Sequence, residues 1–510
     1  MKYNTQIVVL DFGAQYSQLI ARRIREMNIY CEIWPYTTSL EHIQSAGLKG
    51  IILSGGPSSV YDAGAPRVDP ALFDIDVPIL GICYGMQLIS FLLGGTVLQG
   101  SHREYGNTAI NIKHSRPLFS GLPSTIPVWM SHGDRLETTP NGFTVLASSG
   151  NTPLAAMGNH AKKIYGVQFH PEVTHTPNGQ HILKNFVTEI CQCTANWRME
   201  DFVSDSIETI RKQAQGRTVV CGVSGGVDST VLAKLLTEAL GDAVSCIYVD
   251  NGVMRLHETD EVRRNFERIG VEVTYINAAD GFLRRLNGIR DPEKKRRRIG
   301  KHFVNVFFSA VKNFDMLAQG TLYPDVIESI SVKGPSKTIK THHNRVPQIM
   351  KLIEQGRVIE PLKELFKDEV RQIGRVLKIP EEILMRWPFP GPGLAIRIIG
   401  AVTPARLYIL RRADAIVREE LLAGAPDEIW QAFAVLLPVK SVGVMGDERT
   451  YENVITVRAV SSIDGMTADW SKISHDVLGR ISNRIINEVN GVNRVVYDIS
   501  SKPPATIEWE

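Results

Sequence analysis

The chain reads Thr218-Val-Val-Cys-Gly-Val-Ser-Gly-Gly-Val-Asp-Ser-Thr230 near its middle, and an apolar stretch from Val231 to Leu240 follows. This order predicts a buried strand, a loop rich in glycine and hydroxyl groups, and a helix that ends before Gly241. The backbone N–H groups of such a loop and the positive end of the helix dipole bind oxyanions. We therefore expect a phosphate-binding loop formed by Ser224, Gly225, Gly226, Val227, Asp228, Ser229 and Thr230.

One acidic residue in this loop indicates a cation. Asp228 would repel a phosphate unless a cation lay between them, so we infer that Mg²⁺ bridges its carboxylate and a pyrophosphate group. The loop is not a Walker A motif, because no Gly-Lys-[Ser/Thr] follows at the required spacing. The spacing Gly222-x-Ser224-x-Gly226 also fits a serine-hydrolase turn, but the sequence shows no HGGG-type loop to accompany it. Asp250, at the end of the next predicted strand, is placed either to hold a ribose hydroxyl or to cap a helix.

A second candidate site surrounds a cysteine in the first third of the chain. Gly81-Ile-Cys83-Tyr-Gly85 joins a predicted strand to a predicted helix. The two glycines permit a tight turn that lifts the thiol clear of the sheet, and a helix N-terminus favours a thiolate. Taken alone, an inert buried cysteine is the better interpretation, since free cysteines are among the most buried residues.

A histidine and a glutamate change that interpretation. Val167-Gln-Phe-His170-Pro-Glu172 places the two side chains two positions apart at a strand end, where both point to one face and the proline stops further pairing. The imidazole would take the thiol proton, and the carboxylate would fix the imidazole tautomer. A capped strand end with a solvated glutamate is the alternative. The two patterns in one predicted domain favour a catalytic triad of Cys83, His170 and Glu172.

Two polar loops are candidates for the rest of this site. Ser54-Gly-Gly56-Pro follows a predicted strand and could bring backbone N–H groups to an oxyanion, although a plain turn explains it equally well. Ser131-His132-Gly-Asp134 could bind a zwitterionic substrate, and His132 could also be an ordinary loop histidine.

The composition excludes several classes of protein. At about 150 residues per domain, the 510 residues predict about three domains, and a net charge of +3 gives no support for a nucleic-acid or membrane partner. The apolar stretch from Val77 to Ser101 contains Pro78 and several glycines, so it predicts a strand, a turn and a helix instead of a membrane span. Six cysteines without C-x-x-C spacing indicate a reducing, cytoplasmic location, and we expect no secretory leader.

Alternating strand and helix patterns predict an α/β fold. One series runs to about residue 190 and a second starts at Thr218, with a polar connector between them. The segment Trp387-Pro-Phe-Pro-Gly-Pro-Gly393 must interrupt any regular element, and a third segment of mixed helices and strands follows it. We therefore place domains at residues 1–192, 200–385 and 386–510.

A basic segment from Arg284 to Lys301 contains nine lysine or arginine residues. Asp291 predicts a helix cap, and apolar residues that recur every four positions give this helix one buried face. A solvated basic face is the better interpretation of the charges, because a nucleic-acid surface would need aromatic residues among them.

Together these motifs resemble the glutamine-dependent GMP synthetase family over essentially the whole chain. The resemblance implies a class I glutamine amidotransferase domain, an ATP pyrophosphatase domain of the adenine-nucleotide α-hydrolase-like type, and a smaller α+β domain for dimerisation and for binding xanthosine monophosphate (XMP). Glutamine hydrolysis would supply ammonia, Mg²⁺-ATP would adenylate O2 of XMP, and ammonia would displace AMP to give GMP, a step of purine biosynthesis. A homodimer without a nucleic-acid or membrane partner is expected.

The resemblance also implies roles for particular residues. Cys83, His170 and Glu172 would be the catalytic triad, with oxyanion and glutamine contacts from Gly56, Tyr84, Gln87, His132 and Asp134. ATP would bind to the loop from Ser224 to Thr230 and to Asp250, with Asp228 as the metal ligand. XMP would bind to Lys502, Ile507 and Glu508 in the last segment, and its phosphate to Lys340 and Arg458.

In one place the chain departs from the family pattern. After His342-His-Asn344 it continues Arg345-Val-Pro-Gln348, where the family has Val-Gly-Gly-Leu-Pro. The loss of two glycines stiffens this loop. How far the loop moves, and which basic residue it delivers to the substrate, therefore do not follow from the resemblance.

Three other functions stay open. A different amidotransferase-coupled ligase, such as an NAD synthetase, would share both catalytic halves but not the segment from Lys502 to Glu510. An RNA-thiolating enzyme would need reactive cysteines near the phosphate loop and would leave the Cys83 triad without a use. A non-enzymatic regulator is opposed by intact residues at every catalytic position.

Overall fold

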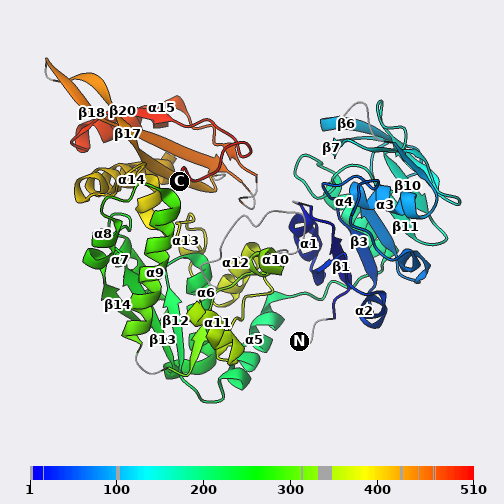
Figure 1. Cartoon of the computed structure of the whole chain (residues 1–510), viewed down its shortest axis with the longest axis horizontal. Helices are drawn as coiled ribbons and strands as arrows, with labels where there is room; N and C mark the ends of the chain where they lie inside the picture. Colours follow the sequence, from blue (N-terminus) through cyan, green and yellow to red (C-terminus); the bar gives the residue numbers. More distant parts are fainter. Residues whose placement is uncertain are drawn as a thin grey trace. The chain divides into compact units, whose positions relative to one another are not determined.

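The computed structural model describes residues 4–14, 16–98, 104–311, 314–330, 347–424, 429–445, 447–462, 465 and 467–510. The chain forms two compact units (Figure 1), Met1–Phe202 with Tyr323–His342 and Val203–Leu322 with His343–Glu510. The α/β class predicted from the alternating patterns is confirmed in both units. Among the described residues, no helix is both long enough and apolar enough to cross a bilayer.

The first unit is built on a nine-stranded sheet with the order β2-β1-β3-β4-β11-β10-β9-β6-β7. The strands of its parallel part are β1 (Ile7–Asp11), β2 (Cys31–Pro35), β3 (Gly50–Leu53), β4 (Ile79–Ile82) and β11 (Ile164–Val167). The strands of its antiparallel part are β6 (Glu104–Ile112), β7 (Thr125–His132), β9 (Thr144–Ser148) and β10 (Ala156–Asn159). Strands β1, β3, β4 and β11 are apolar and almost entirely buried, as expected for parallel strands covered on both faces.

Helices follow the parallel strands of this unit. Helix α1 (Ser17–Arg25) follows β1, and helix α3 (Tyr84–Leu92) follows β4. The uncharged stretch that begins at Val77 forms β4, α3 and β5 (Thr96–Leu98), which confirms the prediction of a strand, a turn and a helix.

A segment distant in sequence also packs in the first unit. Helix α10 (Tyr323–Ile330) contributes Tyr323, whose hydroxyl accepts a 2.6 Å hydrogen bond from the backbone N–H of Ile33 in β2. The guanidinium of Arg25 lies 4.9 Å from the Tyr323 ring centroid and 4.8 Å from that of Tyr30. Cation–π contacts of this kind help to hold α10 against the edge strand of the sheet.

The second unit contains a five-stranded parallel sheet with the order β14-β13-β12-β15-β16. The strands are β12 (Val219–Val223), β13 (Val244–Asp250), β14 (Val273–Asn277), β15 (Met316–Ala318) and β16 (Val358–Ile359). Its helices include α6 (Val227–Leu240), α7 (Glu258–Arg268), α8 (Ala279–Leu286), α9 (Pro292–Ala310) and α12 (Lys367–Val376), and α5 (Met199–Ala214) runs across the sequence boundary between the two units at Phe202.

Helix α9 carries most of the basic segment. The predicted cap is confirmed, because the Asp291 carboxylate accepts a 2.7 Å hydrogen bond from the N–H of Lys294. Lys295 differs from the expected solvated face, since it is fully buried and its Nζ donates to the carbonyl oxygens of Ala395 and Ile398 at 3.0 and 2.7 Å. The reason is tertiary, because the segment that supplies these carbonyls packs against α9 about a hundred residues later in the chain.

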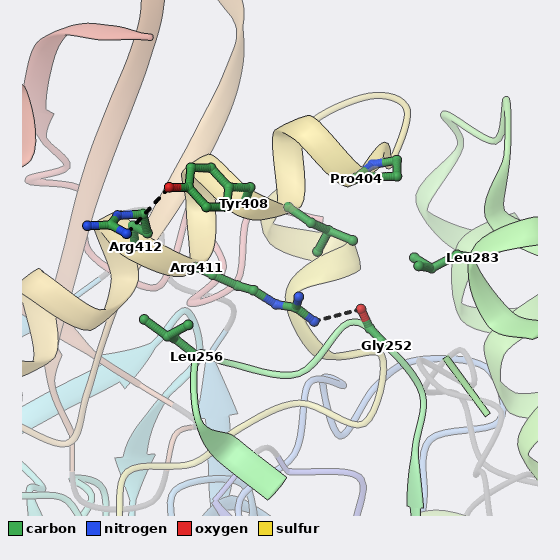
Figure 2. Close-up of a pocket in the computed structure, with 8 residues that line it drawn as sticks. Gly252, Leu256, Leu283, Pro404, Tyr408, Arg411 and Arg412 are labelled. Carbon is green, nitrogen blue, oxygen red and sulfur yellow. Dashed lines mark hydrogen bonds between the residues drawn. The ribbon is translucent and has the colours of Figure 1, made fainter. Parts of the chain in front are cut away.

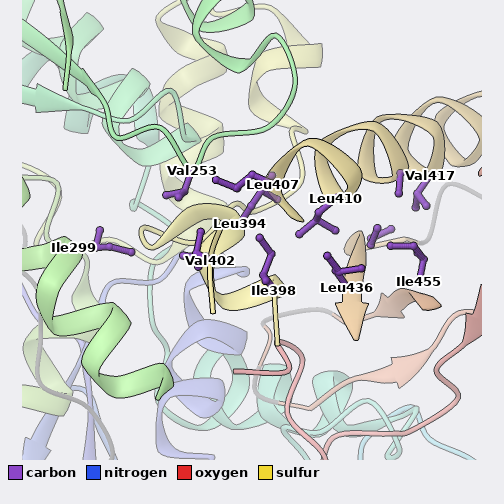
Figure 3. Packing of buried hydrophobic residues seen from close by; sticks show 14 of the residues in the cluster. Val253, Ile299, Leu394, Ile398, Val402, Leu407, Leu410, Val417, Leu436 and Ile455 are labelled. Carbon is purple, nitrogen blue, oxygen red and sulfur yellow. The ribbon is translucent and has the colours of Figure 1, made fainter. Parts of the chain in front are cut away.

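The C-terminal part of the second unit packs two helices on a small sheet. The elements are α14 (Pro404–Gly424), β17 (Gln431–Met445), β18 (Glu448–Ser461), β19 (Asp469–Trp470), α15 (His475–Glu488) and β20 (Val492–Tyr497). One buried hydrophobic cluster continues from the parallel sheet into this part (Figure 3), since Val253 and Ile299 belong to the same cluster as Leu394, Leu410 and Leu436. The division at residue 386 stays a prediction.

Substitution of Leu410 in α14 tests how much this shared cluster contributes to the free energy of unfolding. Leu410 is fully buried, whereas Leu422 on the same helix is 67% exposed. We expect Leu410→Ala to lower the free energy of unfolding by about 2–5 kcal/mol, because it leaves a cavity. The matched variant Leu422→Ala should cost less than about 0.5 kcal/mol. Denaturant-induced unfolding measures both, and equal losses would contradict the assignment of Leu410 to the core.

Candidate active site

Cys83 stands at a sharp turn between a strand and a helix. Strand β4 ends at Ile82, α3 begins at Tyr84, and Cys83 between them has φ 51° and ψ −107°, a rare conformation for a residue other than glycine. A Cβ on Gly85 would lie 2.4 Å from the carbonyl oxygen of Leu53, so only glycine lets the helix approach the sheet this closely. The side chain of Cys83 is therefore held at the carboxyl end of the parallel strands.

The sheet register brings the predicted histidine to the same place. Strands β4 and β11 are parallel neighbours in which Ile82 pairs with Val167, and Cys83 N–H donates to Val167 C=O at 2.8 Å. His170 lies three residues beyond Val167 and is 5% exposed. Its Nδ1 lies 2.7 Å from a carboxylate oxygen of Glu172, and Cys83 lies close enough to contribute to the pKa of the imidazole. The structure thus joins the three predicted triad residues in one chain of contacts.

The electrostatics of this group favour a charged imidazole. Burial by itself lowers the pKa of His170, but the Glu172 charge, the hydrogen bond to Glu172 and the neighbouring Cys83 outweigh it and raise the pKa well above its ordinary value. The ring of Tyr16 also contacts His170 edge to face, with ring centroids 5.4 Å apart. A neighbouring imidazolium is the arrangement that activates a cysteine nucleophile.

The candidate oxyanion groups lie beside the triad. Gly56 and Tyr84 are close to each other, since a Cβ on Gly56 would lie 3.4 Å from the Tyr84 ring. The preceding Gly55 is near both catalytic side chains, because a Cβ there would lie 3.3 Å from the His170 ring and 3.8 Å from the Cβ of Cys83. This loop after β3 therefore borders the Cys83 side chain, as a donor of N–H groups to an oxyanion there must.

The three candidate glutamine contacts also gather here. Gln87 Nε2 donates to the carbonyl oxygen of Asp134 at 2.9 Å, and Nδ1 of His132 lies 3.0 Å from the same oxygen. His132 also pairs with Glu104, with 3.5 Å between the ring nitrogen and the carboxylate. Burial lowers the pKa of His132, although the Glu104 charge opposes this shift.

Sequence reasoning assigned no role to two polar residues of this group. Gln168 is fully buried, donates to Cys83 Sγ at 3.7 Å and accepts from Gln87 at 3.4 Å. No local pattern reveals these contacts, because Cys83 and Gln87 lie 85 and 81 residues earlier in the chain. Glu104 reaches His132 through the antiparallel pairing of β6 with β7, and no local pattern in the sequence reveals that register.

The expected phosphate loop has the predicted strand, turn and helix. Ser229 Oγ accepts from the N–H of Ser224 at 3.2 Å and donates to the carbonyl oxygen of Gly226 at 3.0 Å. Thr230 Oγ1 donates to the same carbonyl at 2.9 Å. Asp228 lies in the first turn of α6, with Lys367 Nζ 3.9 Å from its carboxylate. The hydroxyl groups thus fold the loop back on the start of the helix, whose N-terminal end suits an anion.

Asp250 stands at the carboxyl end of the neighbouring strand β13. Its carboxylate accepts hydrogen bonds from the N–H of Gly252 at 2.8 Å and from Thr259 Oγ1 at 2.9 Å. A cavity of about 290 Å³ opens beside this turn. Figure 2 shows Arg411 of α14 pointing to the turn, where it donates to the Gly252 carbonyl at 2.8 Å. The cavity is lined by the loop after β13, by Leu283 of α8 and by α14.

The C-terminal candidates lie in one docked tail. Arg458 is fully buried and donates to the carbonyl oxygens of Ser500 and Thr506 at 2.5 and 3.2 Å. Lys502 Nζ donates to Gly465 at 2.7 Å, and Ile507 packs with Phe433 and Val435. Glu508 accepts from Arg397 at 3.1 and 2.8 Å and from Gln431 at 2.9 Å. Lys340 and the loop that follows it lie outside the described residues.

Three family models match the chain. They are glutamine amidotransferase class-I at residues 8–190, NAD synthase at 197–297 and GMP synthase C terminal domain at 419–509. The chain is also similar over its length to curated glutamine-hydrolysing GMP synthases. It is 55% identical to those of Chlorobium chlorochromatii and Caldicellulosiruptor saccharolyticus and 53% identical to that of Aquifex aeolicus, with 99% of both chains covered each time.

The pairing of His170 with Glu172 predicts a pH dependence. In Glu172→Gln the carboxylate charge no longer opposes burial, so NMR titration should show a lower pKa for His170 than in the wild type. The pKa of His170 is raised in the wild-type fold, so the pairing of His170 with Glu172 adds to the free energy of unfolding. This added stability is fully present below about pH 6.5, the ordinary pKa of histidine. It is lost as the pH rises through the pKa of His170 in the folded state. The stability gap between wild type and variant should therefore narrow as pH rises. Glu137→Gln, at an exposed position of strand Arg135–Thr138, is the control, and a gap independent of pH would contradict the pairing.

Proposed function

The chain belongs to the family of glutamine-hydrolysing GMP synthases, and we propose that its two catalytic sites divide the family's reaction between them. The overall reaction is the ATP-dependent amination of XMP to GMP with ammonia from glutamine. The observation that carries this conclusion is identity above 50% over 99% of the chain, together with the contacts that join Cys83, His170 and Glu172. The match of residues 419–509 to the GMP synthase C-terminal model distinguishes this function from that of an NAD synthetase.

Glutamine hydrolysis takes place at the first of these sites. The sulfur of Cys83 attacks the side-chain amide carbon, and N–H groups of Gly56 and Tyr84 stabilise the oxyanion that forms. His170 gives a proton to the leaving nitrogen, the C–N bond breaks and ammonia departs, leaving a thioester. Water then hydrolyses the thioester to glutamate, with Glu172 holding the imidazole in orientation throughout. Gln87, His132 and Asp134 bind the amino and carboxylate groups of glutamine.

Adenylation of XMP takes place at the second site. The loop from Ser224 to Thr230 binds the pyrophosphate part of ATP, and Asp250 binds its ribose. O2 of XMP attacks the α-phosphorus, pyrophosphate leaves, and ammonia then attacks C2 and releases AMP. The described residues hold no cluster of three or more metal-ligating side chains. A single carboxylate at the loop suits Mg²⁺, which neutralises phosphate charge when bound and takes few protein ligands, and we assign Asp228 to it.

XMP is held by the docked tail in this proposal. Lys502, Ile507 and Glu508 supply its contacts, and the many bonds that fix the tail support a preformed site. The observed bonds of Arg458 support a role in holding the tail, and its expected phosphate contact stays a prediction. The phosphate contact of Lys340 stays a prediction as well.

The organisation and location of the enzyme complete the proposal. We assign glutaminase activity to residues 1–192, the ATP site to 200–385 and dimerisation with XMP binding to 386–510. All six cysteines are free thiols, as is typical of proteins in a reducing compartment. This supports a cytoplasmic location.

The donor specificity of Cys83→Ala tests the assignment of two sites. We expect the variant to lose glutamine-dependent GMP formation by a factor of about a thousand or more. Ammonium-dependent formation should be unchanged, because ammonia enters after the step that needs the thiol. The control is Cys193→Ala, a partly exposed thiol elsewhere in the first unit. A wild type that makes no GMP from either donor would refute the substrate assignment.

An exposed apolar face supports the homodimer. On the hairpin of β17 and β18, Val442 pairs with Tyr451, and Val442, Val444 and Tyr451 are 45%, 75% and 64% exposed. Exposed apolar patches mark interfaces. We expect wild type to sediment as a dimer and the double variant Val444→Glu with Tyr451→Glu to sediment as a monomer. Leu422→Glu is the control, and a double variant that stays dimeric would place the interface elsewhere.

A further inference from the structure

We infer that Arg386 is a positioning residue that holds the phosphate loop in its binding shape, an inference that rests on the proposed binding of ATP to Ser224–Thr230. Arg386 immediately precedes the segment Trp387–Gly393, and its side chain is 9% exposed. Its Nη1 donates to the carbonyl oxygen of Gly225 at 3.0 Å. No sequence motif marks this arginine, because its partner in the loop lies 161 residues earlier in the chain.

Helix α7 holds Arg386 from the other side. Nη2 of Arg386 lies 2.7 Å from a carboxylate oxygen of Glu258 and 3.4 Å from one of Glu261. Glu258 is 2% exposed. A buried guanidinium with a buried carboxylate at this distance is fixed in place, because leaving either charge without its partner is costly. The planar head group of Arg386 is therefore anchored to α7 while it holds the loop carbonyl.

The same helix also supports the loop backbone directly. Gly225 has φ +76°, and a Cβ there would lie 2.3 Å from Cγ2 of Val262, so the loop rests on α7 at a distance that only glycine allows. Glu258, Glu261 and Val262 are spaced i, i+3 and i+4 and share one face of α7. Gly225 thus packs against Val262 of α7, and its carbonyl oxygen binds Arg386, which is itself held by Glu258 and Glu261. The residues of α7 that hold the loop in these two ways lie on one face of the helix.

The charges around Arg386 favour a positioning role for this residue over direct contact with the phosphates of ATP. Arg386 has two carboxylates near its guanidinium and donates a hydrogen bond to a backbone oxygen. The two carboxylates neutralise the positive charge of Arg386, and the Gly225 carbonyl accepts one of its hydrogen bonds. Arg386 therefore contributes to ATP binding by orienting the N–H groups beside Gly225. Lysine is not equivalent, because Arg386 reaches the carbonyl with Nη1 and the carboxylate with Nη2, and one ammonium nitrogen cannot occupy both positions of the planar fork.

The test compares Arg386→Lys and Arg386→Gln with a matched surface variant. The control is Arg375→Gln, whose side chain is 49% exposed and pairs with Glu381. We expect the KM for ATP in ammonium-dependent GMP formation to rise about tenfold in both Arg386 variants, the size expected for loss of one charge-assisted hydrogen bond. The KM for XMP and the hydrolysis of glutamine alone should be unchanged, and the control should match wild type. Calorimetric titration with Mg²⁺-ATP should show the same loss of affinity.

A double variant separates positioning from stability. Arg386→Gln leaves Glu258 buried without its guanidinium partner, and the melting temperature should fall by roughly 5 °C or more. Combining it with Glu258→Gln removes the unpaired charge, so the melting temperature should recover while the affinity for ATP stays low. Recovery of both together would make Arg386 a purely structural residue and overturn the inference.

Two further results would also decide the matter. Wild-type affinity for Mg²⁺-ATP in Arg386→Gln, or its restoration by lysine, would overturn the positioning role and leave the proposed function intact. Absence of GMP formation by the wild type would instead overturn the proposed function, and the calorimetric titration would still decide whether Arg386 shapes an ATP-binding loop.

Discussion

A backbone hydrogen bond from Cys83 N–H to Val167 C=O joins the two strand ends that carry Cys83 and His170, the residues proposed for glutamine hydrolysis. It continues the parallel register of β4 with β11, and in that register the residues that follow both strands must emerge at one edge of the sheet. Cys83 comes one residue after β4 and His170 three residues after β11. A shift of one strand by one residue would turn that strand's side chains to the opposite face and separate Cys83 from His170. The buried strands on both sides make such a shift costly, so the catalytic geometry follows from the sheet core.

In the second unit the candidate ligand-binding residues also follow parallel strands, and this unit contains buried charged side chains as well. The phosphate loop follows β12 and Asp250 ends β13, so both stand at the carboxyl edge where parallel sheets bind ligands. In the same unit, Nε of Arg255 lies 3.5 Å from the Asp414 carboxylate, and the guanidinium groups of Arg255 and Arg397 lie 4.4 and 5.4 Å from the Phe389 ring centroid. Arg397 then reaches Glu508 in the tail. Buried charges are costly unless they are paired, so these contacts hold the segment around Phe389, helix α14 and the C-terminal tail together.

Part of this organisation could be read from local patterns. The sequence predicted the tight turn at Cys83, the pairing of His170 with Glu172, and the strand, loop and helix around Val223. Each of these features depends on residues that are close together in the chain. The predicted cap at Asp291 succeeded for the same reason. The contacts of Gln168, Glu104 and Arg386 were not predicted, because each needs a strand register or a packing partner far away in sequence.

The sequence by itself therefore determined the chemistry available to this protein, since turns, caps and strand ends are set by neighbouring residues. It determined the α/β class, the strained turn at Cys83 and the glycine-rich loop between β12 and α6. Only the tertiary structure decided which groups meet: His170 with Cys83, Lys295 with carbonyls about a hundred residues later, and Arg386 with Gly225. The physical reason is that burial of a charged or polar side chain requires a partner, and the packing of distant segments chooses that partner.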